Sequence, residues 1–287
     1  MTARSLANEV ETLFSMPEVV YRLAQLLSTP SASNGEIGEV LSHDPALTAR
    51  ILRLVNSGSG DSPSRIETVS GAIALIDRDS LVNLVVAASM ASQFQGIPPE
   101  LIDMERFWLN SVACGVIARS LAFRCRLWQS EPLFVAGLLH KVGRLVFYSL
   151  RPEQYRQVLV QADQGEEALN RAERRVFGYT HAEVGAELLR CWRFPERIEA
   201  AVAHYLAPAE APPRFRKHAA LIHVASALAC AIEPSVNLDE VLHDKGVSFE
   251  KGAWDLLGLP LHSITPILDE GWVQAFEIFD ILRPAPL

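Results

Sequence analysis

A histidine and a lysine stand side by side in the apolar segment GLLHKVGRLVF, residues 137–147. Gly137, His140, Lys141 and Arg144 are spaced by three and four residues, so a continuous helix would present them on one narrow, cationic face. Such a face is either a solvated stripe on a buried helix or the lining of a crevice that Gly137 keeps open. In the second case its positive charge favours an anion such as a nucleotide or phosphate.

The sequence around this segment is typical of helices almost throughout. Ser33 with Glu36 three residues later forms a capping-box pattern, which marks the start of a helix. Apolar periodicity predicts one helix over residues 131–150 and another over 216–232. No alternation of polar and apolar residues lasts long enough to indicate a sheet. The predicted fold class is therefore all-α, with packed helices around a continuous core.

The dipeptide His-Asp, which could bind a metal, occurs at His43–Asp44 and at His243–Asp244. Asp44 stands before a proline that can start a helix, so N-capping explains it. His243–Asp244 is followed by Lys-Gly, where a helix should stop. Neither pair lies inside an apolar helix, and both are interpreted as structural.

The composition restricts the classes of partner. The chain has 287 residues and a net charge of −8, whereas binding to nucleic acid or to an anionic membrane needs clustered positive charge. No segment resembles a leader or is apolar for long enough to span a bilayer. Four scattered cysteines at no zinc or redox spacing are interpreted as reduced core thiols of a cytoplasmic protein. The charged stretch RAERRVFG, residues 171–178, is interpreted as a solvated helix face.

Several motifs, in order along the chain, resemble the HDOD family, a regulatory branch of the HD superfamily of metal phosphohydrolases. They are HDPALTARILRLVNSG (43–58), FWLNSVACGVIARSLA (107–122), FVAGLLHKVGRLVF (134–147) and FGYTHAEVGAELLRCWRFPERIEAAVAHY (177–205). The resemblance covers roughly residues 10–210. It implies a multi-helical fold of two packed lobes and a signalling module that is usually not catalytic.

The same resemblance assigns the positions of the catalytic HD pattern. Asn110 stands where the first metal-binding histidine would be, and His140 with Lys141 represents the His-Asp pair. His181 opens its own helix, and His204 lies where a further histidine can occur. These residues, together with Arg144, form the predicted binding site. The region of the distal aspartate matches HVASALA only loosely and carries a serine, Ser226.

Lys141 argues against the inherited metal chemistry. A unit positive charge repels a dication by roughly 8 kcal/mol at about 4 Å, twice the value for two unit charges near a protein surface, whereas an aspartate would attract it. The sequence therefore predicts no catalytic residue, no metal at this position and no cofactor. The alternative is a rearranged phosphohydrolase site in which His140, His181 and His204 hold the metal.

The expected domain organisation has three parts: an N-terminal helical lobe at 1–100, an HD-like lobe at 101–210 and a helical extension at 211–287 packed on the HD-like lobe. The expected function is that of a non-catalytic signalling module, such as the output part of a response regulator. It would act by binding a partner protein, with a homodimer and a nucleotide or phosphate ligand as further possibilities. Neither nucleic acid nor a membrane is expected as a partner.

Overall fold

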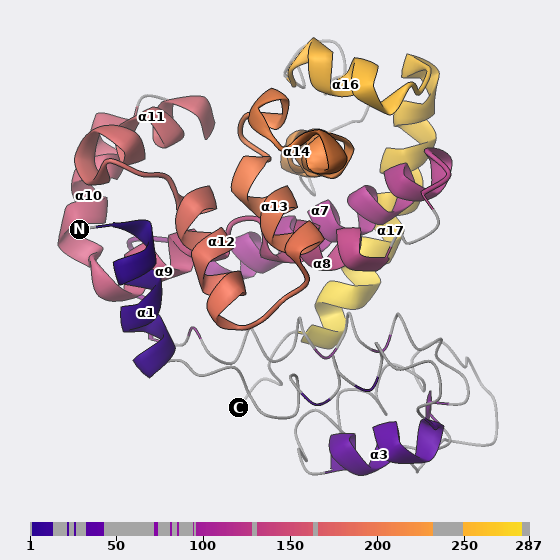
Figure 1. The fold of residues 1–287 in the computed structure, drawn as a ribbon, viewed down its shortest axis with the longest axis horizontal. Coiled ribbons are helices and arrows are strands. Elements are labelled where there is room, and N and C mark those ends of the chain that lie inside the picture. The colour runs from indigo at the N-terminus through magenta and orange to yellow at the C-terminus, as the bar shows by residue number, and fades with distance from the viewer. Residues whose placement is uncertain are drawn as a thin grey trace. The chain divides into compact units, whose positions relative to one another are not determined.

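The computed structural model of the chain describes residues 2–13, 33–42, 96–127, 131–162, 166–231 and 249–282, and seven single positions between 22 and 94. Every regular element among these residues is a helix, which confirms the all-α prediction (Figure 1). The chain divides into two compact units. Residues 1–15 and 96–276 form the first unit, and residues 16–95 and 277–287 form the second.

The first unit contains nearly all of the described helices. They are α1 (Ala3–Leu13), α7 (Met104–Arg124), α8 (Glu131–Leu139), α9 (Val142–Leu150), α10 (Pro152–Gln161), α11 (Glu166–Phe177), α12 (His181–Cys191), α13 (Glu196–His204), α14 (Arg216–Ala231) and α16 (Lys251–Leu257). Three short 3-10 turns, at Pro208–Glu210, Pro213–Phe215 and Leu261–Ser263, connect the later helices. Helix α17 (Ile264–Leu282) begins in this unit and continues into the second.

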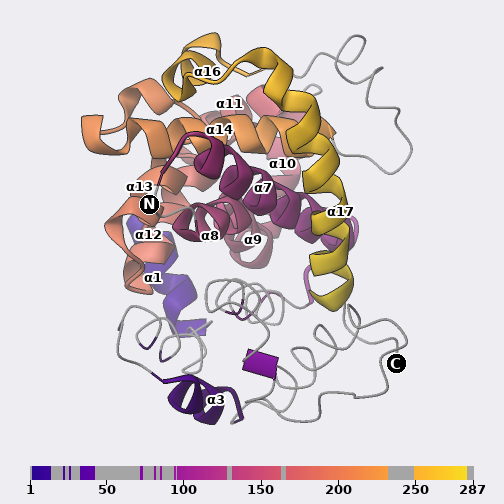
Figure 2. The same cartoon turned by 90° about the vertical axis from the view of Figure 1, so that its right-hand side faces the viewer.

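The core of the first unit forms around α7, which packs against α8 and α14 (Figure 2). Helix α12 in turn packs against α1, α9 and α13. Apolar side chains such as Val112, Ile117, Leu138, Val146 and Ile222 are almost completely buried between these helices. The candidate site residues therefore lie on helices held in place by a large apolar core.

Side-chain caps mark two helix starts in the first unit. Asp103 precedes α7 and accepts a hydrogen bond from the backbone N–H of Arg106 at 3.1 Å. Thr180 precedes α12, and the Glu183 carboxylate accepts a hydrogen bond from the Thr180 backbone N–H at 2.8 Å. These caps satisfy N–H groups that the first turn of a helix leaves unpaired, which fixes where α7 and α12 begin.

The predicted continuous helix over 131–150 is wrong at its centre. Helix α8 ends at Leu139 and α9 begins at Val142, so His140 and Lys141 form a two-residue turn between them. The Gly137 carbonyl is hydrogen-bonded to the His140 ring instead, with Nδ1 2.6 Å from the carbonyl oxygen. An uninterrupted helix would give this carbonyl the backbone N–H of Lys141. Because of this break, Gly137, His140, Lys141 and Arg144 do not share one helix face.

Two glycines allow neighbouring helices to approach closely on either side of this turn. A Cβ at Gly137 would lie 2.8 Å from the Cys114 carbonyl oxygen of α7, and one at Gly143 would collide with the His181 carbonyl oxygen of α12. Gly137 therefore permits the crossing of α7 and α8, and the expectation that it keeps a crevice open is wrong. The turn at 140–141 is fixed between two tight helix crossings.

The described part of the second unit includes α3 (Asn34–Ser42), whose start confirms the predicted capping box. The Glu36 carboxylate accepts from the Ser33 backbone N–H at 2.7 Å, and the Ser33 hydroxyl accepts from the Glu36 backbone N–H at 3.2 Å. Ile37 and Leu41 on this helix are buried. The proposed cap at Asp44 and the dipeptide at 243–244 lie outside the described residues.

Contrary to the expectation that no segment is apolar for long enough to span a bilayer, one stretch of the described chain, Pro132–Leu150, has the length and apolar composition of a membrane span. Within the protein, 89% of this stretch is buried. Because the core helices of soluble proteins meet the same two criteria, this stretch is only a weak sign of a membrane segment. Its burial is consistent with a soluble protein.

Candidate functional site

The predicted site is a buried polar cluster that surrounds the turn between α8 and α9. His140 is fully buried, and its ring is hydrogen-bonded on both sides. Nδ1 donates to the Gly137 carbonyl at 2.6 Å, which leaves Nε2 to accept from the Ser226 hydroxyl of α14 at 3.0 Å. Burial, followed by the adjacent Lys141 charge, lowers the pKa of His140 well below its usual value, so the ring is neutral. Ser226 thus meets His140 where the loosely aligned distal position was expected.

Lys141 is a buried cation with partners of its own. Its Nζ lies 2.9 Å from Glu166 Oε1 and 3.1 Å from Asn110 Oδ1. The Cys230 thiol is 3.8 Å from the same nitrogen. Burial alone would lower the pKa of Lys141, but electrostatic interactions with the neighbouring Cys230 side chain and the Glu166 carboxylate outweigh it and raise the pKa. The lysine is therefore charged and is bound where the family pattern expects a carboxylate.

Arg144 joins the same carboxylate from the first turn of α9. Its guanidinium donates to both oxygens of Glu166, with Nη1 3.2 Å from Oε1, and Nη2 also lies 3.4 Å from Asn170 Oδ1. On its other side, Nε lies 3.6 Å from Glu173 Oε1. Burial would raise the pKa of Glu166, but Arg144 and then Lys141 outweigh it and lower the pKa well below the usual carboxyl range. Glu166 is therefore an ionised carboxylate that bridges two cations.

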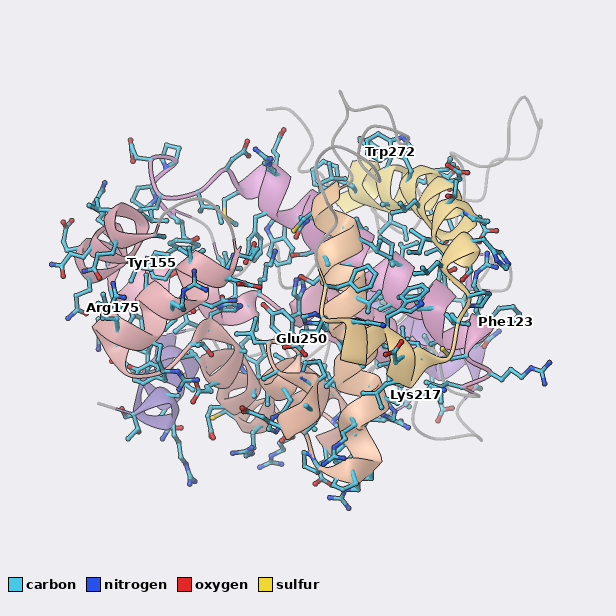
Figure 3. The ribbon with its side chains drawn as sticks, turned by 90° about the horizontal axis from the view of Figure 1, so that it is seen from above. Phe123, Tyr155, Arg175, Lys217, Glu250 and Trp272 are labelled. Atoms are coloured by element: carbon cyan, nitrogen blue, oxygen red, sulfur yellow. The ribbon has the colours of Figure 1, made fainter. Side chains whose placement is uncertain are left out.

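Glu173 lies in the fully buried part of the cluster. Its side chain is fully buried and accepts hydrogen bonds from the Tyr155 hydroxyl at 2.6 Å and from the His181 backbone N–H at 2.8 Å. His181 Nδ1 donates to the same carboxylate at 2.7 Å, so Nε2 accepts from the Tyr205 hydroxyl. Tyr155, labelled in Figure 3, extends from α10. Burial lowers the pKa of His181 despite the nearby carboxylate, and the ring is neutral.

The structure brings five of the six predicted site residues into this cluster: Asn110, His140, Lys141, Arg144 and His181. The expectation that His204 joins His140 and His181 is not met. Its neighbour Tyr205 lies between them instead, with its ring centroid 5.1 Å from that of His140 and 5.8 Å from that of His181. His204 is half-buried at the end of α13.

Several residues of the cluster do not follow from the motifs. They are Tyr155, Glu166, Glu173, Tyr205 and Cys230. The interpretation of 171–178 as a solvated face is correct for the exposed arginines and wrong for Glu173. Leu169 and Phe177 lie four residues before and after Glu173, which places it on the apolar side of α11 and could have indicated burial.

Cys230 also departs from its expected environment. All four cysteines are free, as expected, but Cys230 is exposed and is not a core thiol. Its Sγ lies 3.7 Å from the Asn110 amide nitrogen in addition to its contact with Lys141. The other three are buried or half-buried, and burial raises the pKa of the Cys114 thiol far above its usual value.

The residues in the cluster do not fit a divalent metal. A metal would need unprotonated imidazole nitrogens and carboxylate oxygens directed at one point. Here both ring nitrogens of His140 and of His181 are used in hydrogen bonds, and an ammonium and a guanidinium occupy the centre. In the part of the chain that the structure describes, no three His, Cys, Asp or Glu side chains are placed to hold a metal ion.

Comparison with known proteins identifies the family. The family model described as "HDOD domain" matches residues 13–208. An uncharacterized protein of Treponema pallidum (strain Nichols) is 25% identical over 201 residues, which are 68% of this chain and 38% of that protein. The chain thus spans well under half the length of this curated relative.

Solved structures share the fold over nearly the whole chain. An HDOD domain protein of unknown function from Geobacter sulfurreducens is 24% identical, with 98% of each chain covered and a TM-score of 0.75. A protein of Shewanella amazonensis SB2B, named as a candidate phosphohydrolase, is 24% identical with a TM-score of 0.76, over 97% of this chain and 98% of the other. A Marinobacter aquaeolei VT8 protein, named as a candidate signal transduction protein, is 22% identical with a TM-score of 0.73. The match covers 96% of this chain and 60% of that protein's chain.

Proposed function

Because the chain belongs to the HDOD family, a relative of the HD phosphohydrolases, we propose that it is a cytoplasmic regulatory module that has lost phosphohydrolase chemistry at its HD-like site. In this proposal the module acts by binding a partner protein, and the polar cluster is a ligand-responsive or structural centre. The greater length of the Treponema pallidum relative agrees with a module that is combined with other sequence.

The contact between Lys141 and Glu166 is the observation that carries this proposal. At 2.9 Å, with the lysine side chain only 6% exposed, an internal ammonium already neutralises the carboxylate that could otherwise attract a cation. Arg144 adds a second positive charge on the same carboxylate. A dication placed about 4 Å from the Lys141 ammonium or from the Arg144 guanidinium would be repelled by that cation by roughly 8 kcal/mol.

The alternative enzyme has little support in this arrangement. A three-histidine site needs His204 beside His140 and His181, and Tyr205 takes that place. General acid–base chemistry also needs a group that can exchange protons with a substrate in reach. His140 and His181 are fully buried, and each is tied to two partners.

Metal-dependent stability and hydrolysis measured on the same protein test the proposal. We expect Mn²⁺, Fe²⁺ and Zn²⁺ to leave the melting temperature of the purified chain unchanged, because a ligand that binds only the folded state must stabilise it. We also expect no metal-dependent hydrolysis of a chromogenic phosphodiester. The Lys141→Asp variant is the matched comparison, since it restores the carboxylate of the HD pattern. A metal-induced rise in melting temperature for the wild type, with turnover, would overturn the proposal in favour of the enzyme.

A further inference from the structure

We propose that Lys141 and Arg144 form a receptor for a phosphate group, and that the Glu166 carboxylate is a tethered occupant which the ligand displaces. This inference deepens the proposed function and rests on it, because it takes the centre of the cluster to be an anion site and not a metal site. The ligand class is a phosphate dianion, either free or as the terminal group of a nucleotide.

The two cations are held in a form that suits an oxyanion. Their side chains are 6% and 7% exposed, so neither can rotate freely into water. Both donate to one carboxylate: Arg144 through both terminal nitrogens and Lys141 through its ammonium. A planar guanidinium fork beside a point charge is the combination that proteins use to bind phosphate. Two amide oxygens, from Asn110 and Asn170, position the cations from the sides.

Glu166 differs from the other anion of the cluster in its access to solvent. Its side chain is 44% exposed, whereas that of Glu173 is fully buried. Glu166 is also the first residue of α11, so its side chain reaches the cations from the end of the helix. Part of the Glu166 side chain is thus open to solvent, and in the proposal the ligand approaches from that side and displaces the carboxylate from the two cations.

Charge favours a phosphate over the carboxylate that it replaces. A phosphate monoester carries a charge of about −1.5 to −2 at neutral pH and offers three acceptor oxygens, against one charge and two oxygens for glutamate. The tether opposes the exchange, because a linked group competes at an effective concentration on the order of millimolar or more. The wild-type protein is therefore expected to bind inorganic phosphate weakly, and removal of the tethered carboxylate should strengthen binding.

Displacement of Glu166 would alter one end of α11 only. The other end stays attached through Glu173, which binds His181, Tyr155 and Arg144. Phosphate binding would thus release the first turn of α11 at the protein surface while the core remains intact. A change confined to an exposed helix end is the type of signal that a partner protein can detect.

Calorimetric titration of inorganic phosphate into the wild type, Glu166→Gln and Glu166→Ala tests the receptor. Both variants should bind phosphate at least tenfold more tightly than the wild type. Glu166→Gln keeps the size of the side chain and covers the case in which the alanine variant does not fold. Chloride at equal ionic strength controls for screening. The control variant Glu9→Ala removes the carboxylate of another ion pair, 2.7 Å from Arg151, and should bind phosphate no better than the wild type.

The result that overturns the inference is equal phosphate affinity, or no binding, in the wild type and both Glu166 variants. Tighter binding by Glu9→Ala as well would overturn it equally, because the effect would then be general to cations that lose a paired carboxylate. Adenosine monophosphate is a second arm: tighter binding than inorganic phosphate identifies a nucleotide, and equal binding identifies free phosphate. Hydrogen exchange should increase with phosphate in the first turn of α11 and not around Glu173.

Failure of the phosphate receptor can be distinguished from failure of the proposed function. If phosphate does not bind and metals neither stabilise the protein nor promote hydrolysis, the receptor is wrong and the regulatory module stands. If metals bind and turnover occurs, the proposed function fails whatever phosphate does.

Discussion

Glu166 and Glu173 lie seven residues apart on α11, and both face the guanidinium of Arg144, yet their environments are opposite. Glu166 is 44% exposed, and its partners are the Lys141 and Arg144 cations. Glu173 is completely buried, with a relative exposure of 0%, and it accepts hydrogen bonds from Tyr155 and His181. The two glutamates hold the same helix by different physical means.

This difference in exposure indicates which of the two carboxylates a ligand could replace. When a buried carboxylate loses its charge, its hydrogen-bond donors lose their partner and no water can take its place. The free energy of unfolding then falls by a large amount. A half-exposed carboxylate can be replaced by water or by another anion at a smaller cost. The end of α11 at Glu173 is therefore part of the architecture, and the end at Glu166 is the part that can respond to a ligand.

Glu173→Gln should have the largest effect on stability. The substitution removes the charge that the Tyr155 hydroxyl, the His181 ring and the Arg144 guanidinium share, and loss of one partner from a buried charged network costs about 3–5 kcal/mol. Urea unfolding followed by circular dichroism gives the free energy of unfolding. A loss no larger than the loss of about 1–2 kcal/mol expected for the same change at Glu166 would mean that the two ends of α11 are equivalent, and the comparison would fail.

Mild acid should destabilise the protein through its buried histidines. Burial lowers the pKa of His140 and of His181 in the folded state, whereas an unfolded histidine titrates near a pH of about 6.5. The unfolded chain therefore binds more protons below that pH, and stability falls by up to about 1.4 kcal/mol per pH unit for each histidine. Glu173, whose pKa is lowered because His181 and Arg144 outweigh its burial, adds a further loss only below about pH 4.3.

Unfolding in urea between about pH 7 and about pH 5 measures this slope. The His140→Gln variant should show a smaller slope than the wild type, because one of the two buried rings is gone. Stability that is constant or that increases over this range would contradict neutral, buried histidines.

Glu166→Gln should have the smallest effect, a loss of about 1–2 kcal/mol. Part of this side chain is exposed to solvent, so its interactions contribute less than those of the fully buried Glu173. The same unfolding measurement in low and in high salt sharpens the comparison, since added salt should reduce the effect at Glu166 more than that at Glu173. A loss as large as that of Glu173→Gln would show that Glu166 is also architectural and would weaken its role as a displaceable group.

Local features of the fold could be predicted well from the sequence. The capping boxes at Ser33 and Thr180, the helix over 216–231 and the absence of strands among the described residues all depend on spacings of a few residues. The break at 140–141 was missed because apolar periodicity continues through it. The residues on either side of the break approach α7 and α12 closely, and local periodicity carries no information on such contacts between helices.

Prediction of the candidate site from the sequence failed in a similar way at Tyr205, which contacts His140 and His181 in place of the expected His204. Adjacent positions at the end of a helix point about 100° apart, so the rotation of α13 decides which side chain meets His140 and His181. Packing against α12 and α14 sets that rotation. No motif in the segment AHYL distinguishes the two residues, although the buried side of α13 can be recognised from Ile198 and Val202.

Most of the helices, the cap at Ser33 and the lysine at the position where the HD pattern has an aspartate can be predicted from the sequence, because each depends on residue type and short spacing. Which charges are buried, and which partners they bind, depends instead on how the helices pack. Lys141, Glu166 and Asn110 come from three separate elements, and their pairing depends on how those elements pack. Burial determines how strongly charges interact, and burial is a property of the packed core and not of the local sequence.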